Sequence, residues 1–174
     1  MEQGYKLRSM GRALGFLLLF ITLAGTLWGQ STANYTFSTA TDGSLTDMSS
    51  GTTLLQSTTG ATDQASAVVD IGFPFVFMGV PYTQFSVNNN GLMRFGSTVI
   101  GTTFSNALAT TSNLPLLAPF WDDLNSSTTE GTTKTHYKVT GSAPSRILTV
   151  EWKDAIIAYN ASTAGGGSTF QVRL

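Results

Sequence analysis

The chain has 174 residues, of which 41% are hydrophobic and only 11% are charged, and its formal net charge at pH 7 is −1. It contains no cysteine, 18 serines and 27 threonines, so its polar surface is mostly hydroxyl. This composition excludes a coiled coil, a disulfide scaffold and a thiol enzyme, and it provides no basic surface for nucleic acid. Few charges with many threonines favour β-structure, because Ser and Thr compete with the helical backbone for hydrogen bonds.

The amino terminus has the layout of a secretory signal peptide. Three basic residues before position 13 precede a stretch, residues 13–28, that carries no charge. An uncleaved transmembrane anchor is the alternative, but a bilayer span needs about 20 apolar residues. We predict a signal peptide over residues 1–33, cleaved between Gly29 and Asn34, and hence a secreted or cell-surface protein. Contact with a membrane is expected only through this leader, if it stays uncleaved.

The mature chain divides into a polar part and an apolar part. Residues 34–67 are rich in Thr, Ser and Gly, and they predict either short edge strands or a loosely ordered arm. Residues 68–174 carry the core signal, which begins with apolar side chains at every second position from Ile71 to Phe77. Pro74 lacks an N–H group and therefore predicts an edge strand or a bulge at this point.

A hairpin is expected in the middle of the chain. Asn90 and Gly91 stand between two alternating segments, and Asn-Gly favours a type I′ turn in which both residues have positive φ.

The clearest half-buried strand covers residues 146–153. Leu148, Val150 and Trp152 share one face of it, while Thr149 and Glu151 face the other side. A last alternating strand begins near the carboxyl end and the chain stops inside it, which suggests a fragment or a truncated reading frame. Many short strands separated by turn signals predict an all-β fold, an antiparallel β-sandwich or jelly roll.

Aromatic and aliphatic side chains are expected to fill the interior. Alternation places them on buried faces and needs no ligand to explain it, although a sugar-stacking platform is the alternative. Tyr82, Tyr137 and Tyr159 are expected nearer the surface, because a phenol suits a position with one end in water. The predicted core consists of Phe73, Phe75, Phe120, Trp121, Leu148, Val150, Trp152 and Phe170.

Asp122, Asp123 and Asn125 follow the buried Trp121 and are the candidate metal ligands. Their oxygens suit calcium, but the alternative is a turn in which they accept backbone hydrogen bonds, and three ligands fall short of the usual six. The two carboxylates do not suggest a catalytic pair, since adjacent strand residues point to opposite faces. We predict no other cofactor.

His136 is the only histidine, and its place between two strand residues suggests an exposed side chain. A hydrolase would have to use it as the base, yet the sequence has no Gly-x-Ser-x-Gly elbow. One histidine without cysteine also leaves no zinc site. We therefore expect no enzyme and name no catalytic residue.

Several blocks together resemble nidogen-like extracellular modules. They are residues 71–75 (IGFPF), 87–96 (VNNNGLMRFG), 116–124 (LLAPFWDDL), 143–152 (APSRILTVEW) and 169–174 (TFQVRL). The likeness is nearest to modules of large secreted Bacteroidota proteins, which often end in a type IX secretion sorting domain. It implies an all-β extracellular module with an adhesive or structural role and no catalytic residues to transfer. The sequence departs from the pattern in lacking a sorting domain and the strand that normally follows the last block.

The function expected from these features is that of a non-catalytic secreted or cell-surface module with an adhesive, structural or protein-interaction role. The alternative is a carbohydrate-binding module of an extracellular degradative protein. Its partner would be an extracellular protein or a glycan.

Overall fold

A computed structural model describes residues 35–57, 63–109, 114–126, 133–157 and 167–174. The chain divides into two compact units, residues 1–37 and residues 38–174, and the second contains every strand found in the described residues. The predicted signal peptide, residues 1–33, lies outside the described residues. Within the described ranges, no helix has the length and apolar character to cross a membrane.

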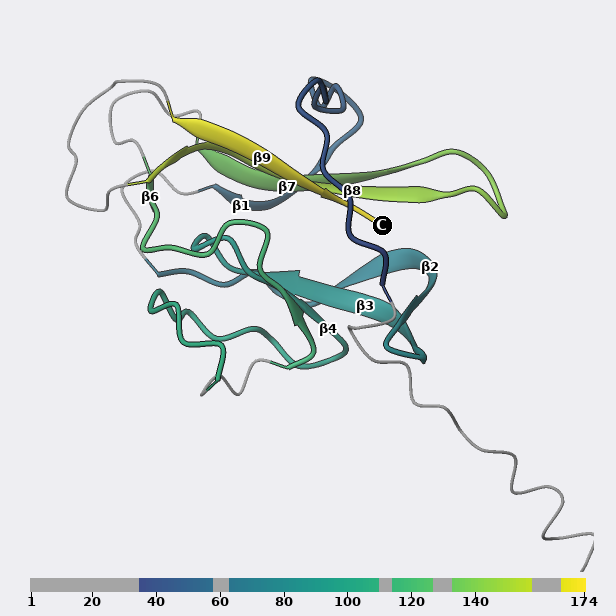
Figure 1. Cartoon of the computed structure of the whole chain (residues 1–174), viewed down its shortest axis with the longest axis horizontal. Coiled ribbons are helices and arrows are strands. Elements are labelled where there is room, and N and C mark those ends of the chain that lie inside the picture. The colour runs from purple at the N-terminus through teal and green to yellow at the C-terminus, as the bar shows by residue number, and fades with distance from the viewer. Residues whose placement is uncertain (1–34, 58–62, 110–113, 127–132, 158–166) are drawn as a thin grey trace, which may run out of the picture. The chain divides into compact units, whose positions relative to one another are not determined.

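The strands of residues 38–174 form two antiparallel sheets that face each other (Figure 1). The first sheet has five strands: β1, β7, β8 and β6 are hydrogen-bonded in this order, and β9 pairs with β8 outside this path. The second sheet has the order β2-β3-β4-β5. The bounds in the first sheet are β1 Thr53–Ser57, β7 Lys134–Thr140, β8 Ile147–Ile156, β6 Asn125–Ser126 and β9 Ser168–Arg173. Those in the second are β2 Val69–Phe77, β3 Val80–Val87, β4 Met93–Phe95 and β5 Leu116–Leu117. All regular structure in the described residues is β-strand, so the predicted all-β sandwich is confirmed.

Apolar side chains from both sheets form the main core. Phe95 of β4 lies at its centre, with the rings of Phe75, Phe77 and Tyr82 at centroid distances of 5.3, 5.2 and 5.5 Å. Trp152 of β8 packs against this core from the other sheet. Aromatic rings therefore join the two sheets, as the alternating pattern predicted.

Most of the predicted core positions are confirmed. Leu148, Val150 and Trp152 are fully buried, and Phe73, Phe75 and Phe170 are half-buried against them. Trp121 is buried in a second, smaller cluster with Leu92 and Ile100. Pro74 lies in edge strand β2, whose pairing with β3 shifts register between Asp70 and Phe75, as predicted.

Phe120 is a correction, because its side chain is 38% exposed. The next residue, Trp121, takes the interior position, in the cluster with Leu92 and Ile100. The Phe120 ring lies instead at the margin of the sandwich, 5.5 Å from the ring of Phe170.

The half-buried positions of Tyr82 and Tyr137 agree with a phenol that has one end in water, and their rings also contribute to the core. The ring of Tyr137 in β7 contacts the ring of Phe85 in β3 edge-on, with 5.5 Å between the ring centroids, so this contact joins the two sheets. Tyr159 lies outside the described residues.

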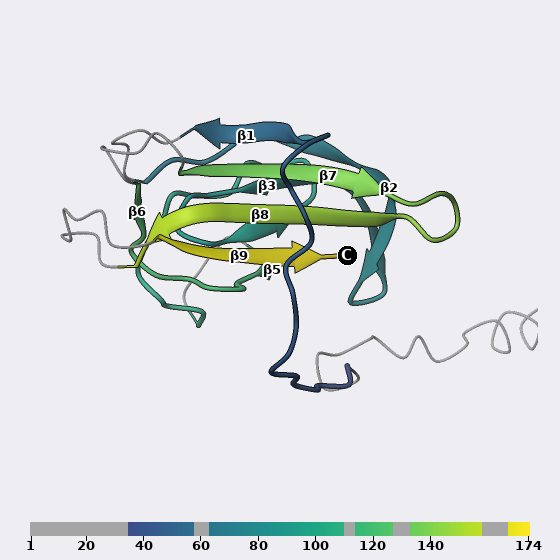
Figure 2. The same ribbon diagram turned by 90° about the horizontal axis from the view of Figure 1, so that it is seen from above.

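Strand β8 is buried on both faces, which corrects the prediction of a half-buried strand. Residues 45–51, here called the strap, cross the outer face of β9, β8 and β7 on their way to β1 (Figure 2). Thr149 and Glu151 are buried on this outer face, and so is His136, which was expected to be exposed. The polar part of the chain thus supplies an edge strand, β1, and a cover for the sheet.

Candidate functional site

Residues 88–92 connect β3 to β4 and form the centre of the candidate site; they are here called the asparagine loop. The N–H of Asn88 donates to the carbonyl of Leu92 at 3.0 Å, which leaves a three-residue connection. Gly91 has a φ of +78°, but Asn90 does not have positive φ. The predicted type I′ turn is therefore wrong, because the hairpin uses a longer connection in which only its third residue needs the left-handed conformation.

The asparagine loop is buried, unlike an ordinary hairpin turn. Asn88 and Asn90 have no exposed surface and Asn89 is 8% exposed. A buried amide must find hydrogen-bond partners to offset its lost contact with water. The partners lie on segments far from the loop in sequence.

Asn88 and Asn89 tie the loop to its surroundings. The Asn88 amide donates to the carbonyl of Gly101 at 3.0 Å, and its backbone carbonyl accepts from the Trp152 indole at 2.8 Å. The side-chain oxygen of Asn89 accepts from the N–H of Gln64 at 2.8 Å. These bonds connect the asparagine loop to β8, to the segment around Gly101 and to the segment around Gln64.

Asn90 joins three further segments. Its amide donates to a carboxylate oxygen of Asp63 at 2.8 Å and to the carbonyl of Thr102 at 3.3 Å. Its side-chain oxygen accepts from the N–H of Leu124 at 3.1 Å. From the sequence, Asn90 was expected only as a turn residue. The run of three asparagines is the sequence feature that could have indicated these further hydrogen bonds.

Three carboxylates lie near this loop. Burial raises the pKa of Asp123, and the charges of Asp63 and then Asp122 raise it further. Asp122 accepts the N–H of Asp123 on its own carboxylate at 2.8 Å, which is the turn chemistry that the sequence analysis considered. Asp63 was not anticipated, because it is far from the other two acids in sequence.

The three candidate calcium ligands lie in the segment between Trp121 and the end of β6. Asn125 lies in the short strand β6, where its backbone pairs with Ile156. Within the described parts of the chain, no group of three or more His, Cys, Asp or Glu side chains is arranged to hold a metal ion. Calcium binding by Asp122, Asp123 and Asn125 therefore stays an untested alternative to the turn.

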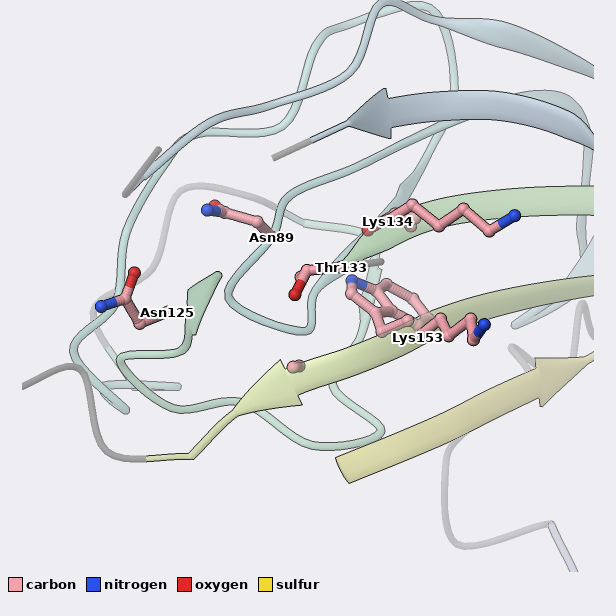
Figure 3. Close-up of a pocket in the computed structure, with 8 residues that line it drawn as sticks. Asn89, Asn125, Thr133, Lys134 and Lys153 are labelled. Atoms are coloured by element: carbon pink, nitrogen blue, oxygen red, sulfur yellow. The ribbon is translucent and has the colours of Figure 1, made fainter. Parts of the chain in front are cut away.

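A small pocket lies between the asparagine loop and the five-stranded sheet (Figure 3). It encloses about 10 Å³, which is room for about one water molecule. The side chains of Lys134 and Lys153 extend along the strands and away from Asn89. The pocket is lined by Asn89, Asn125, Thr133, Lys134, Thr135, Trp152, Lys153 and Ala155. This pocket is too small for a sugar ring.

His136 lies on the other side of the five-stranded sheet and is 1% exposed. Its Nε2 is 2.7 Å from a carboxylate oxygen of Glu151, which is also buried. The imidazole is thus paired with Glu151 beneath the strap and shielded from solvent.

A comparison with known families places the chain. A family model described as NIDO related matches residues 34–174. The chain belongs to the NIDO-related family. No curated protein and no solved structure matches it. The nidogen-like resemblance seen in the sequence blocks is confirmed at the level of this family, and the NIDO-related segment includes both sheets, the strap and the asparagine loop.

Proposed function

We propose that this NIDO-related segment is a non-catalytic module of a secreted or cell-surface protein, and that it acts by contact with another extracellular macromolecule. Family membership and the layout of the leader support an extracellular location. The narrower likeness to modules of Bacteroidota proteins exported by the type IX route is part of this proposal, and it rests on the sequence blocks alone.

The observation that carries the proposal is the way the asparagine loop holds the connections around it. Asn88 and Asn90 bind carbonyls of the connection 97–109, and Asn90 also binds the backbone of the segment that follows β5. These connections carry large apolar side chains that are 38–62% exposed: Val99, Phe104, Leu108 and Phe120. Loops held in place by a rigid scaffold are where binding residues concentrate, and exposed apolar side chains on them favour a protein partner.

A non-catalytic role is supported by the surroundings of His136. A general base must come within hydrogen-bond reach of the proton that it removes. His136 instead contacts the buried Glu151 beneath the strap. Its geometry fits a buried structural hydrogen bond better than a base.

The carbohydrate-binding alternative has less support from the geometry. A sugar platform needs exposed aromatic faces, and the rings of Phe95, Trp152 and Tyr82 pack inside the sandwich. The exposed rings of Phe104 and Phe120 stand on two different connections. A glycan array with the purified protein distinguishes the two functions.

The contact proposal is tested by immobilising the purified protein and measuring how many cells of the source organism it retains. Leu108→Asp places a charge on the fixed connection and is expected to lower retention at least about tenfold. Val76→Asp is the matched control, because Val76 is 54% exposed on β2, outside the connections.

If both variants retain as many cells as the parent protein, the connections are not the contact surface and this part of the proposal is wrong. A specific glycan signal whose free sugar abolishes retention would establish the carbohydrate-binding function instead.

A further inference from the structure

The strap is attached to the sheet by side chains and forms no strand of its own. The N–H of Thr46 donates to the side-chain oxygen of Gln171 at 2.9 Å, and the Gln171 amide donates to the carbonyl of Thr46 at 2.8 Å. Lys138 of β7 donates to the carbonyl of Asp47. Of the strap residues, only Met48 is buried. Few contacts therefore hold this segment in place.

A continuous polar network lies beneath the strap. Glu151 accepts from His136 on one carboxylate oxygen at 2.7 Å and from Gln171 on the other at 2.6 Å. Because Gln171 also binds Thr46, the network runs from the buried imidazole to the strap backbone. Gln171 is thus the residue that connects the sheet to its cover.

The covered face also contains polar atoms that closure leaves unsatisfied. His136 Nδ1 and Thr149 Oγ1 are buried, and neither has a hydrogen-bond partner in the part of the chain that the structure describes. A buried polar atom without a partner destabilises the state that buries it, since water would satisfy it when exposed. The burial of Met48 and the Gln171 bonds favour closure, and these two atoms oppose it.

We propose that the strap is a releasable cover that opens as a unit while the two sheets stay folded. Opening breaks the paired bonds between Thr46 and Gln171, exposes Met48 and hydrates the polar outer face of β7 and β8. The side chains that become accessible are those of His136, Thr149 and Glu151. This inference concerns the opposite face from the pocket beside the asparagine loop and stands independently of the contact proposal.

Amide hydrogen exchange followed by NMR on the purified protein tests the opening. The Thr46 N–H reports the strap because it bonds to the Gln171 side chain, and the Leu148 N–H reports the sheets because it bonds to the carbonyl of Leu174. Local opening predicts that Thr46 exchanges at least about a hundredfold faster than Leu148. Equal protection of the two amides would overturn the proposal.

Two variants test the forces on the strap. Thr149→Val keeps the side-chain shape, removes the unsatisfied hydroxyl and is expected to slow Thr46 exchange about tenfold. Thr140→Val, the same change at an exposed position of β7, is the control and should leave the rate unchanged. If the two variants behave alike, the hydroxyl does not oppose closure and the proposal fails.

Gln171→Met keeps the side-chain length and removes the bonds to Thr46 and Glu151. It is expected to speed Thr46 exchange at least about tenfold while Leu148 exchange stays unchanged. Equal acceleration of both amides would mean that the strap is an integral part of the sandwich, and the proposal would be wrong.

Discussion

An asparagine side chain carries both a donor and an acceptor, so each buried asparagine of the asparagine loop can join two segments. Asn90 uses both groups, with Asp63 and Thr102 as acceptors and Leu124 as donor. A threonine at this position would lack the second donor. At the scale of single residues, the amide is what allows a hairpin connection to lie in the interior.

Gly91 is the residue at which this arrangement tolerates no side chain. Its φ is +78°, and a Cβ there would lie 1.9 Å from the carbonyl oxygen of Phe120. Gly91→Ala is expected to lower the free energy of unfolding by about 2–4 kcal/mol, from backbone strain and displacement of the Phe120 backbone.

Gly43→Ala is the matched control for Gly91→Ala. A Cβ at Gly43 meets nothing within 4 Å, so this change should stay within about 0.5 kcal/mol. Denaturant melts of the two variants measure the difference, and equal losses would contradict the close approach of Gly91 to Phe120.

Asp123 makes stability depend on pH. Its pKa is raised above the ordinary value of 3.8, first by burial and then by the charges of Asp63 and Asp122. The folded protein therefore binds the proton more tightly than the unfolded chain, and this contribution is lost as pH rises through the folded pKa. Asp123→Asn should raise the melting temperature at pH 7 and leave it almost unchanged at pH 3. A variant that melts lower at pH 7 would contradict this sign.

Calcium binding at the same acids is tested by removing the ion. Because Asp122 already accepts the N–H of Asp123, we expect a turn at these residues and the same melting curve in calcium as in chelator. A higher melting temperature in calcium that Asp122→Asn abolishes would establish the calcium site instead.

At the scale of elements, alternation predicted the strands and which residues face the main core. Strand β8 shows both the success and the limit. Leu148, Val150 and Trp152 face the core as predicted, but Thr149 and Glu151 are also buried. Their burial depends on the strap, which lies far away in sequence, and a local pattern carries no information about such a contact.

Only part of the candidate site could be predicted from the sequence, because some of its residues come together only in the folded chain. The run of asparagines, the Asp122–Asp123 pair and the buried Trp121 are visible in the sequence. Asp63 joins them only through the fold, by its bond to Asn90. The wrong turn type has a local cause, because Asn-Gly fits more than one hairpin connection and the burial of the loop decides between them.

Trp152 connects the main core to the asparagine loop. Its ring stacks on Phe170 at 5.1 Å and its indole N–H donates to the carbonyl of Asn88. Trp152→Ala should cost about 3–5 kcal/mol, from lost burial and the resulting cavity. Trp152→Phe keeps much of the ring but leaves the Asn88 carbonyl without its donor, so it should cost about 1–3 kcal/mol. A shift of melting temperature below about one degree for Trp152→Ala would contradict its core position.

At the scale of the whole molecule, we propose that a cleavable leader precedes a thiol-free sandwich whose loops are held for contact. The leader is a prediction from sequence, and it is tested by sequencing the amino terminus of the protein recovered from outside the cells. Cleavage is expected between Gly29 and Asn34. A mature protein that still begins at Met1 would contradict the signal peptide.

The central claim is that buried asparagines fix the connections that carry the contact surface. Its most direct test is digestion of Asn90→Ala with chymotrypsin, since Phe104 and Leu108 are exposed on the connection that Asn90 holds through Thr102. We expect cleavage after these two residues at least about tenfold faster than in the parent protein, while the Leu148 amide stays protected. Unchanged cleavage at both sites would show that the connection is held without Asn90, and the claim would be wrong.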